Sequence, residues 1–345
     1  MRKVNWKEHI DENELKEIAG KIREGELVVF PTETVYGIGT NALNGEACKR
    51  IFEAKGRPQD NPLIVHVSDK DMLKKYVKNI NEVEEKLIDA FMPGPFTLIL
   101  EKSDEISSVV TAGLDSVAIR MPDNKIAKAI IEEVGYPVAA PSANVSGKPS
   151  GTILDDIKDE LGGKVYCLID GGQTEIGLES TVCKVIGGVP KILRPGKVTK
   201  EDIEKAVGNV TVDEHVLSKV DESEKVESPG MKHKHYSPAT KCVLIDIDDR
   251  ARKAAEISKL LKQKIAVIGF EKTAKILENL EGISRNDFYG FGENLEDISK
   301  NIFTLLRKVD KENYDLIIID SVKPEGLGLA IMNRLLRTCE YNVIK

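Results

Sequence analysis

The segment KGRPQDNPLIVH, residues 55–66, joins a predicted helix over 45–54 to an apolar strand that carries His66. Gly56 and Pro58 break the direction of the chain, because glycine adopts left-handed backbone angles and proline cannot continue a helix. Lys55 and Arg57 therefore lie on one short turn, where two cations favour a bound anion. The alternative is a solvated helix end, at which the helix dipole also favours basic residues.

Small polar and basic residues recur at other strand ends and glycine turns of the first two thirds of the chain, which are common places for ligands. They are Ser142, Asn144, Lys148, Ser150, Ser180, Thr181 and Arg194. A glycine or proline stands directly beside Ser142, Lys148, Ser150 and Arg194 and permits close backbone approach there. The presence of these residues favours a binding site at Lys55 and Arg57 over a solvated helix end.

Outward from that turn, strands and helices mix without strict alternation, which predicts a mixed, twisted sheet covered by helices, with a concave cleft. In TETVYGIGTNA (32–42), Thr32, Thr34 and Tyr36 alternate, and extended geometry would place them on one face. The apolar spacing predicts helices over 12–24, 69–91, 125–134, 153–161 and 199–207. Strands are expected at 26–31, 96–102, 116–122, 137–144, 165–172, 180–186 and 190–196.

The last third of the chain has a different pattern. Residues 208–239 are polar, charged and bounded by prolines, as in a linker. Beyond them, apolar strands alternate with helices, which predicts a small parallel-sheet, Rossmann-like domain. The expected domains are 1–207 for the catalytic domain, 208–239 for a linker that covers the site with Tyr236 as a lid or is merely flexible, and 240–345 for the second domain.

The composition limits the class of protein. Of 345 residues, 41% are hydrophobic and 31% charged, and the net charge is −7, so attraction to nucleic acid over the whole surface is not expected. The sequence has no apolar run of about 18 residues and no signal-peptide core, which predicts a cytoplasmic protein without membrane contact. Five scattered cysteines predict buried thiols. His233 and His235 have no further ligands nearby, so no tightly bound metal is expected.

The phosphate-binding and nucleophile motifs of common enzyme classes are missing. RPGKVT (194–199) lacks Ser or Thr directly after its lysine, and Ser146–Gly147–Lys148 is followed by proline, so neither is a Walker A loop. Any nucleotide would then be held by arginine, lysine, serine and asparagine side chains. No nucleophile elbow or Ser-His-Asp order supports covalent catalysis. His66 has two open interpretations, a packed strand residue or a site residue.

With these residues in view, the chain resembles the threonylcarbamoyl-AMP synthase family. The matching blocks of its YrdC-like domain are PTETVYGIG (31–39), KGRPQDNPLIVHV (55–67), PGPFTLIL (93–100), VAIRMP (117–122), PVAAPSANVSGKPS (137–150), STV (180–182) and ILRPG (192–196). SPGMKHKHYSPA (228–239) and GLGLAIMNRLLR (326–337) resemble the longer, two-domain members.

The resemblance implies a reaction in which L-threonine, bicarbonate and ATP, with Mg²⁺, give L-threonylcarbamoyl-AMP and diphosphate for modification of tRNA at adenosine 37. It implies catalytic roles for Lys55, Arg57, Ser142 and Asn144. It implies threonine binding by Thr34, His66, Arg120, Ala140 and Ser180, and ATP binding by Arg57, Asn61, Ser116, Ser142, Ser150, Arg194 and Tyr236. The implied partners are the downstream machinery that transfers the threonylcarbamoyl group to tRNA, with direct tRNA contact left open.

Two alternatives remain at this point. A cationic cleft also suits an RNA-binding module, but such a cleft needs many spread cations and would bind with steep salt dependence. A related domain that uses other carbamoyl adenylates is the second. The sequence also leaves open whether residues 240–345 gate the active site or dock downstream partners.

Overall fold

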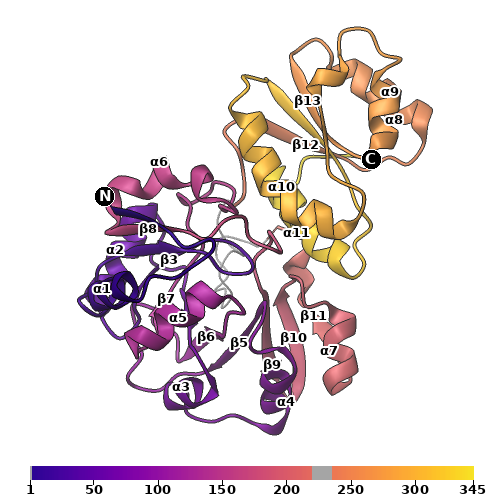
Figure 1. Cartoon of the computed structure of the whole chain (residues 1–345). Coiled ribbons are helices and arrows are strands. Elements are labelled where there is room, and N and C mark those ends of the chain that lie inside the picture. The colour runs from indigo at the N-terminus through magenta and orange to yellow at the C-terminus, as the bar shows by residue number, and fades with distance from the viewer. Residues whose placement is uncertain (1, 220–234) are drawn as a thin grey trace.

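The computed structural model describes residues 2–219 and 235–345, so the middle of the predicted linker, His233 included, lies outside the described residues. The described chain forms two sheet-based parts, with the second placed beside the first in Figure 1. No helix within the described ranges is both long and apolar enough to cross a membrane.

The first part is built on a mixed sheet of eleven strands among the described residues, in the order β1-β8-β2-β3-β7-β4-β6-β5-β9-β10-β11. Parallel pairs such as β4 with β6 occur beside antiparallel pairs such as β9 with β10, so the sheet is mixed, as the sequence pattern predicted. The strands are β1 (Arg2–Asn5), β2 (Val28–Phe30), β3 (Gly37–Asn41), β4 (Ile64–His66), β5 (Phe96–Glu101), β6 (Ser116–Arg120), β7 (Val138–Ala139), β8 (Cys167–Asp170), β9 (Thr181–Ile186), β10 (Val189–Arg194) and β11 (Thr211–Val212).

Helices pack on this sheet and begin at residues whose side chains cap them. Thr199 and Asp202 form the capping box that opens α7, as the sequence predicts. The helices are α1 (Glu12–Arg23), α2 (Gly45–Lys55), α3 (Lys70–Lys75), α4 (Glu82–Phe91), α5 (Lys125–Val134), α6 (Lys158–Leu161) and α7 (Lys200–Val207), with short 3₁₀ turns at Leu154–Asp156, Gly162–Lys164 and Glu214–Val216.

Two local expectations are wrong. The single helix over 69–91 is two helices, because the Asn81 side chain accepts from the backbone N–H groups of Val83 and Glu84 and starts α4 afresh. Residues 32–36 are a turn and not an extended strand, since the Thr32 N–H donates to the Val35 carbonyl. The Tyr36 hydroxyl donates to the Gly172 carbonyl at 2.7 Å, whereas the hydroxyls of Thr32 and Thr34 bond each other.

The second part confirms the predicted Rossmann-like architecture. Its five described strands lie in the order β14-β13-β15-β12-β16, and every pair is parallel. The strands are β12 (Lys241–Ile245), β13 (Ile265–Gly269), β14 (Phe288–Gly290), β15 (Leu316–Asp320) and β16 (Val343–Ile344). The helices are α8 (Arg250–Leu260), α9 (Glu271–Leu277), α10 (Leu295–Asp310) and α11 (Leu327–Thr338), with a 3₁₀ turn at Arg285–Asp287.

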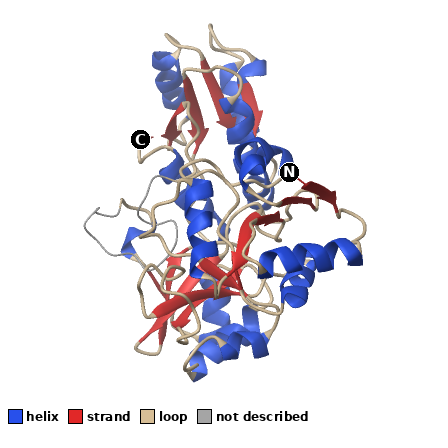
Figure 2. Cartoon of the chain, turned by 90° about the vertical axis from the view of Figure 1, so that its left-hand side faces the viewer, coloured by secondary structure: helices blue, strands red, loops and turns tan. Residues whose placement is uncertain are grey.

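Helices α10 and α11 carry the contact between the two parts, and Figure 2 shows the same arrangement from the side. Val35 and Leu178 of the first part belong to one buried apolar cluster with Phe303 of α10 and Leu335 of α11. Polar contacts surround this cluster, such as the hydrogen bond between the hydroxyls of Thr152 and Thr304 at 2.7 Å. The second part is therefore packed against loops of the first part, both before β9, at Thr152 and Leu178, and after β10, at Pro195.

Candidate active site

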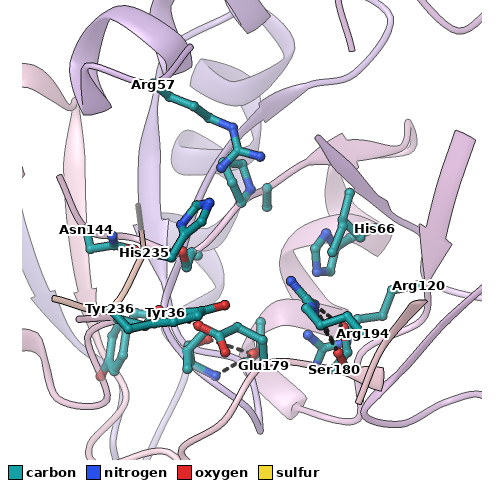
Figure 3. A pocket seen from close by; sticks show the side chains of 18 of the residues that line it. Tyr36, Arg57, His66, Arg120, Asn144, Glu179, Ser180, Arg194, His235 and Tyr236 are labelled. Carbon is teal, nitrogen blue, oxygen red and sulfur yellow. Dashed lines mark hydrogen bonds between the residues drawn. The ribbon is translucent and has the colours of Figure 1, made fainter. Parts of the chain in front are cut away.

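A pocket opens at the ends of several strands of the first sheet (Figure 3). His66 ends β4, Arg120 ends β6, Arg194 ends β10, and Ser180 directly precedes β9. The pocket has about 630 Å³ of empty space, including its open mouth. Its lining residues are Thr32, Val35, Tyr36, Gly37, Arg57, Pro62, Ile64, His66, Arg120, Ala140, Pro141, Ser142, Asn144, Ser150, Glu179, Ser180, Arg194, His235 and Tyr236.

Three guanidinium groups, those of Arg57, Arg120 and Arg194, give this pocket its charge. Burial, and next the charge of Arg194, lower the pKa of Arg57 to about 10. Burial also lowers the pKa of Arg194 to about 10. A buried cation with a lowered pKa lacks full compensation by anions. The pocket is therefore prepared for a negatively charged ligand.

Arg57 reaches the pocket because Gly56 ends α2 in a left-handed conformation, with φ of 60°. The backbone N–H of Arg57 donates to the Phe52 carbonyl at 2.8 Å, which turns the chain sharply. The Arg57 side chain donates to the carbonyls of Asn61 at 3.1 Å and Pro62 at 2.9 Å, which fixes its direction. The sequence prediction of a turn at Gly56 is confirmed.

Lys55 lies behind the lining, not in it. Its amine donates to the backbone carbonyls of Ser142 and, at 2.6 Å, Asn144. Burial holds its pKa well below the usual range. The solvated helix end considered from the sequence is wrong, since the side chain is buried. By its contacts, Lys55 stabilises the turn that carries Ser142 and Asn144.

That turn is held by its own side chains as well. The Ser142 hydroxyl donates to Asn144 Oδ1 at 2.6 Å. The Asn144 amide in turn donates to the carbonyls of Val145 at 2.8 Å and Lys148 at 3.0 Å. These bonds leave the Ser142 oxygen able to accept from a ligand in the pocket.

Arg120, the residue expected to meet the threonine carboxylate, forms a buried ion pair with Glu33 at 2.7 Å. Arg120 is a lining residue and Glu33 is not, so this ion pair holds the guanidinium from outside the lining. Ala140 and Ser180 line the same wall, and Ser180 Oγ accepts from Arg194 at 3.2 Å. Arg120, His66 and Ser180 thus come together as the sequence reasoning expected.

Three other expected residues lie outside the lining. Thr34 is fully buried and shares a hydrogen bond with the Thr32 hydroxyl at 2.8 Å. Ser116 begins β6, at the opposite end of the strand from Arg120. Asn61 precedes Pro62, which lines the pocket, and neither polar atom of its buried side chain has a hydrogen-bond partner within the described residues.

Sequence reasoning missed Glu179 and the ring of Tyr36. Glu179 is the one carboxylate among the described lining residues. The signal that could have found it is a charged residue between Leu178 and Ser180, directly before a buried strand. His235 was considered as a weak metal candidate and as part of a basic linker over a site, and it lines the pocket beside Tyr236.

Comparison with known proteins identifies the family of this fold and site. A family model described as Telomere recombination matches residues 20–196, and one described as Threonylcarbamoyl-AMP synthase, C-terminal domain, matches residues 198–339. A threonylcarbamoyl-AMP synthase of Pyrococcus abyssi is 43% identical over 347 residues, which cover 99% of this chain and 98% of the relative. The chain belongs to the threonylcarbamoyl-AMP synthase family.

Other members of the threonylcarbamoyl-AMP synthase family agree over nearly the whole chain. The Bacillus subtilis synthase is 42% identical over 96% of this chain and 94% of its own. The crystal structure of Pyrococcus abyssi Sua5 complexed with L-threonine superimposes with a TM-score of 0.91 at 42% identity, over 100% of this chain and 99% of that one. The family's members are nucleotidyltransferases, and the resemblance inferred from the sequence is confirmed. The RNA-binding module loses its support.

In this threonylcarbamoyl-AMP synthase family member, His66 should make stability depend on pH. Burial, and next the charge of Arg120, lower the pKa of His66 to about 3. Between pH 6.5 and 3 the unfolded chain takes up a proton that the folded protein does not, so the free energy of unfolding falls as the pH falls. From pH 7 to pH 5 this histidine alone should cost about 2 kcal/mol.

Urea unfolding of the wild type and of His66→Gln at both pH values measures this cost. The wild type should lose about 2 kcal/mol more than the variant, because glutamine does not titrate. An equal loss in the two proteins would mean that the imidazole is protonated in the folded state.

Proposed function

We propose that the pocket makes L-threonylcarbamoyl-AMP and diphosphate from L-threonine, bicarbonate and ATP. The observation that carries this proposal is the meeting of Arg57, Arg120 and Arg194 around one pocket with a single lining carboxylate among the described residues. Guanidinium forks match carboxylate and phosphate groups, both of which these substrates carry. The relative from Pyrococcus abyssi, whose crystal structure contains L-threonine, supports the same assignment.

The reaction requires the protein to position the substrates and to stabilise negative charge. The threonine amine and bicarbonate form a carbamate with loss of water, and a carbamate oxygen then attacks the α-phosphorus while diphosphate leaves. The substrate supplies the nucleophile, which agrees with the missing nucleophile motifs. The barrier then falls mainly by in-line alignment and by stabilising negative charge on the phosphoryl oxygens.

We assign the roles as follows. Arg120, oriented by Glu33, pairs with the threonine carboxylate, and His66, Ala140 and Ser180 line that subsite. Arg57 and Arg194 face the phosphates, with Ser142, Asn144 and Ser150 on the nucleotide side. Lys55 acts through the turn that it holds, and Asn61 offers its unpaired amide to a ligand. Thr34 and Ser116 stay predictions from the resemblance, and Tyr236 covers the nucleotide.

Mg²⁺ would enter with ATP, held by the phosphates and water, as is usual for this ion. No cluster of three or more His, Cys, Asp or Glu residues suited to a metal occurs within residues 2–219 and 235–345. The product is an activated mixed anhydride, and we propose that a transferase hands its threonylcarbamoyl group to tRNA.

The test is direct. The purified protein is incubated with ATP, Mg²⁺, bicarbonate and L-threonine, and diphosphate release is measured beside mass detection of the adenylate. We expect product that requires all three substrates and that falls by about tenfold or more with L-serine, since a pocket loses binding when a methyl group is missing. No adenylate from a folded wild-type protein would overturn the proposal and redirect work to salt-dependent tRNA binding.

A further inference from the structure

Arg334 belongs to α11 of the second part, yet its side chain is completely buried against the first part. Its Nε donates to Glu179 Oε2 at 2.9 Å, and its Nη1 donates to the Pro195 carbonyl at 2.9 Å. Pro195 directly follows Arg194, which lines the pocket. One guanidinium from the second part thus supports two separate segments of the active site.

Glu179 connects Arg334 to Ser150, a residue that lines the pocket. Its Oε1 accepts a hydrogen bond from the Ser150 hydroxyl at 2.5 Å, while Oε2 is engaged by Arg334. Burial acts to raise the pKa of Glu179, and the charges of Arg334 and Arg194 outweigh it, so the pKa is lowered. The carboxylate is therefore ionised and acts as an acceptor toward both neighbours.

The direction of the Ser150 hydrogen bond has a chemical consequence. A serine hydroxyl can donate one hydrogen bond, and that of Ser150 is donated to Glu179. The lone pairs of Ser150 Oγ are what remains for the pocket. Ser150 is thereby suited to a ligand group that donates, such as a ribose hydroxyl or a base amine, and not to a phosphate oxygen.

We propose that Arg334 is a positioning residue for the nucleotide: it fixes Glu179, which orients Ser150 to accept a hydrogen bond from the nucleoside of ATP. This inference rests on the proposed function, because it names the ligand as ATP. It gives residues 240–345 a role in the active site, through a side chain that substrate never touches. In the view of Figure 3, Glu179 lies between the two tyrosines Tyr36 and Tyr236 on one side and Ser180 on the other.

A set of charge variants tests the proposal. Arg334→Gln and Glu179→Gln each leave one buried charge without its partner, whereas the double variant removes both charges and keeps groups that donate and accept. ATP dissociation constants are measured by calorimetry, and KM for ATP and for threonine by diphosphate release. Each single variant should weaken ATP at least tenfold and change KM for threonine less than twofold, and the double variant should recover to within about threefold of the wild type.

Ser299→Ala is the matched control, since Ser299 of α10 also bonds the first part, at the Ile176 carbonyl, outside the pocket lining. It should lower the melting temperature without changing ATP affinity. Ser150→Ala, which keeps the Glu179–Arg334 pair, should weaken ATP by about as much as Arg334→Gln and should not add to it. If Arg334→Gln fails to fold, the double variant and Ser150→Ala still decide the outcome.

The outcomes separate the two proposals. A wild type that makes the adenylate while Arg334→Gln and Ser150→Ala bind ATP normally overturns the positioning role and leaves the function intact. Weakened ATP binding by the variants of a wild type that makes no adenylate supports the positioning role and overturns the function. Equal loss of ATP and threonine binding in Arg334→Gln, matched by Ser299→Ala, would reduce Arg334 to a contact between the two parts.

Discussion

Replacing Arg57 by methionine should lower kcat for adenylate formation about 300-fold, with little change in KM for threonine. A buried donor aimed at charge that develops in the transition state is worth about 10² to 10³ in rate when it is removed. Arg57 meets the conditions, since its guanidinium lines the pocket and burial with the charge of Arg194 lowers its pKa to about 10. Steady-state diphosphate release gives both constants.

Arg50→Met provides the control, because Arg50 lies on α2, which ends just before Arg57, and its side chain is 43% exposed, outside the pocket lining. Its kcat should stay within twofold of the wild type. If Arg57→Met kept a third or more of the wild-type kcat at an unchanged melting temperature, Arg57 would have no part in stabilising the transition state.

Lys55→Met should lower the free energy of unfolding by about 3 kcal/mol, the larger of the stability effects expected here. The substitution removes the Lys55 donor from the carbonyls of Ser142 and Asn144. The Ser142 carbonyl keeps the Asn144 N–H at 3.2 Å, whereas the buried Asn144 carbonyl loses its side-chain donor, and an orphaned buried group costs about 1–3 kcal/mol. Urea unfolding at pH 7 measures the difference, which should appear as a lower midpoint with an unchanged slope.

Lys49→Met on the exposed face of the same helix should change stability by less than about 0.5 kcal/mol. A Lys55→Met variant as stable as the wild type, but without activity, would instead assign Lys55 to charge stabilisation in the reaction. The contacts of Lys55 thus lead to a result that differs from the one expected of a catalytic cation.

Much of this fold could be predicted because local signals agreed with the tertiary structure. Thr199 and Asp202 mark the start of α7, Gly56 ends α2, and the continuous apolar strands after residue 240 predict parallel pairing. The helix break near Asn81 was missed because apolar spacing continued across it, although Asn81 and Glu84 carry the capping-box pattern. Short strands such as β11 gain their order from neighbours and leave little trace in sequence.

The sequence predicted several residues that line the site, but not which residues lie behind the lining and support it. Arg57, Arg120 and Arg194 lie at turns and strand ends, where sequence reasoning looks for ligands, and they line one pocket. Lys55 stands two residues from Arg57, and the reversal at Gly56 sends it to the far side of the lining. The bond between Glu179 and Arg334 joins residues 155 positions apart, and nothing local in either stretch indicates it.

The apolar cluster shared by Val35, Leu178, Phe303 and Leu335 has a consequence for dividing this protein. A fragment that ends near residue 207 would expose Val35 and Leu178 to water and invite association with other molecules. Fusion partners, affinity tags and split-protein designs are better placed at exposed surface sites, such as the hairpin between β9 and β10, where Ile186 is already exposed. Because both parts contribute side chains to this cluster, a substitution on one side is tolerated only if it still packs against the residues of the other side.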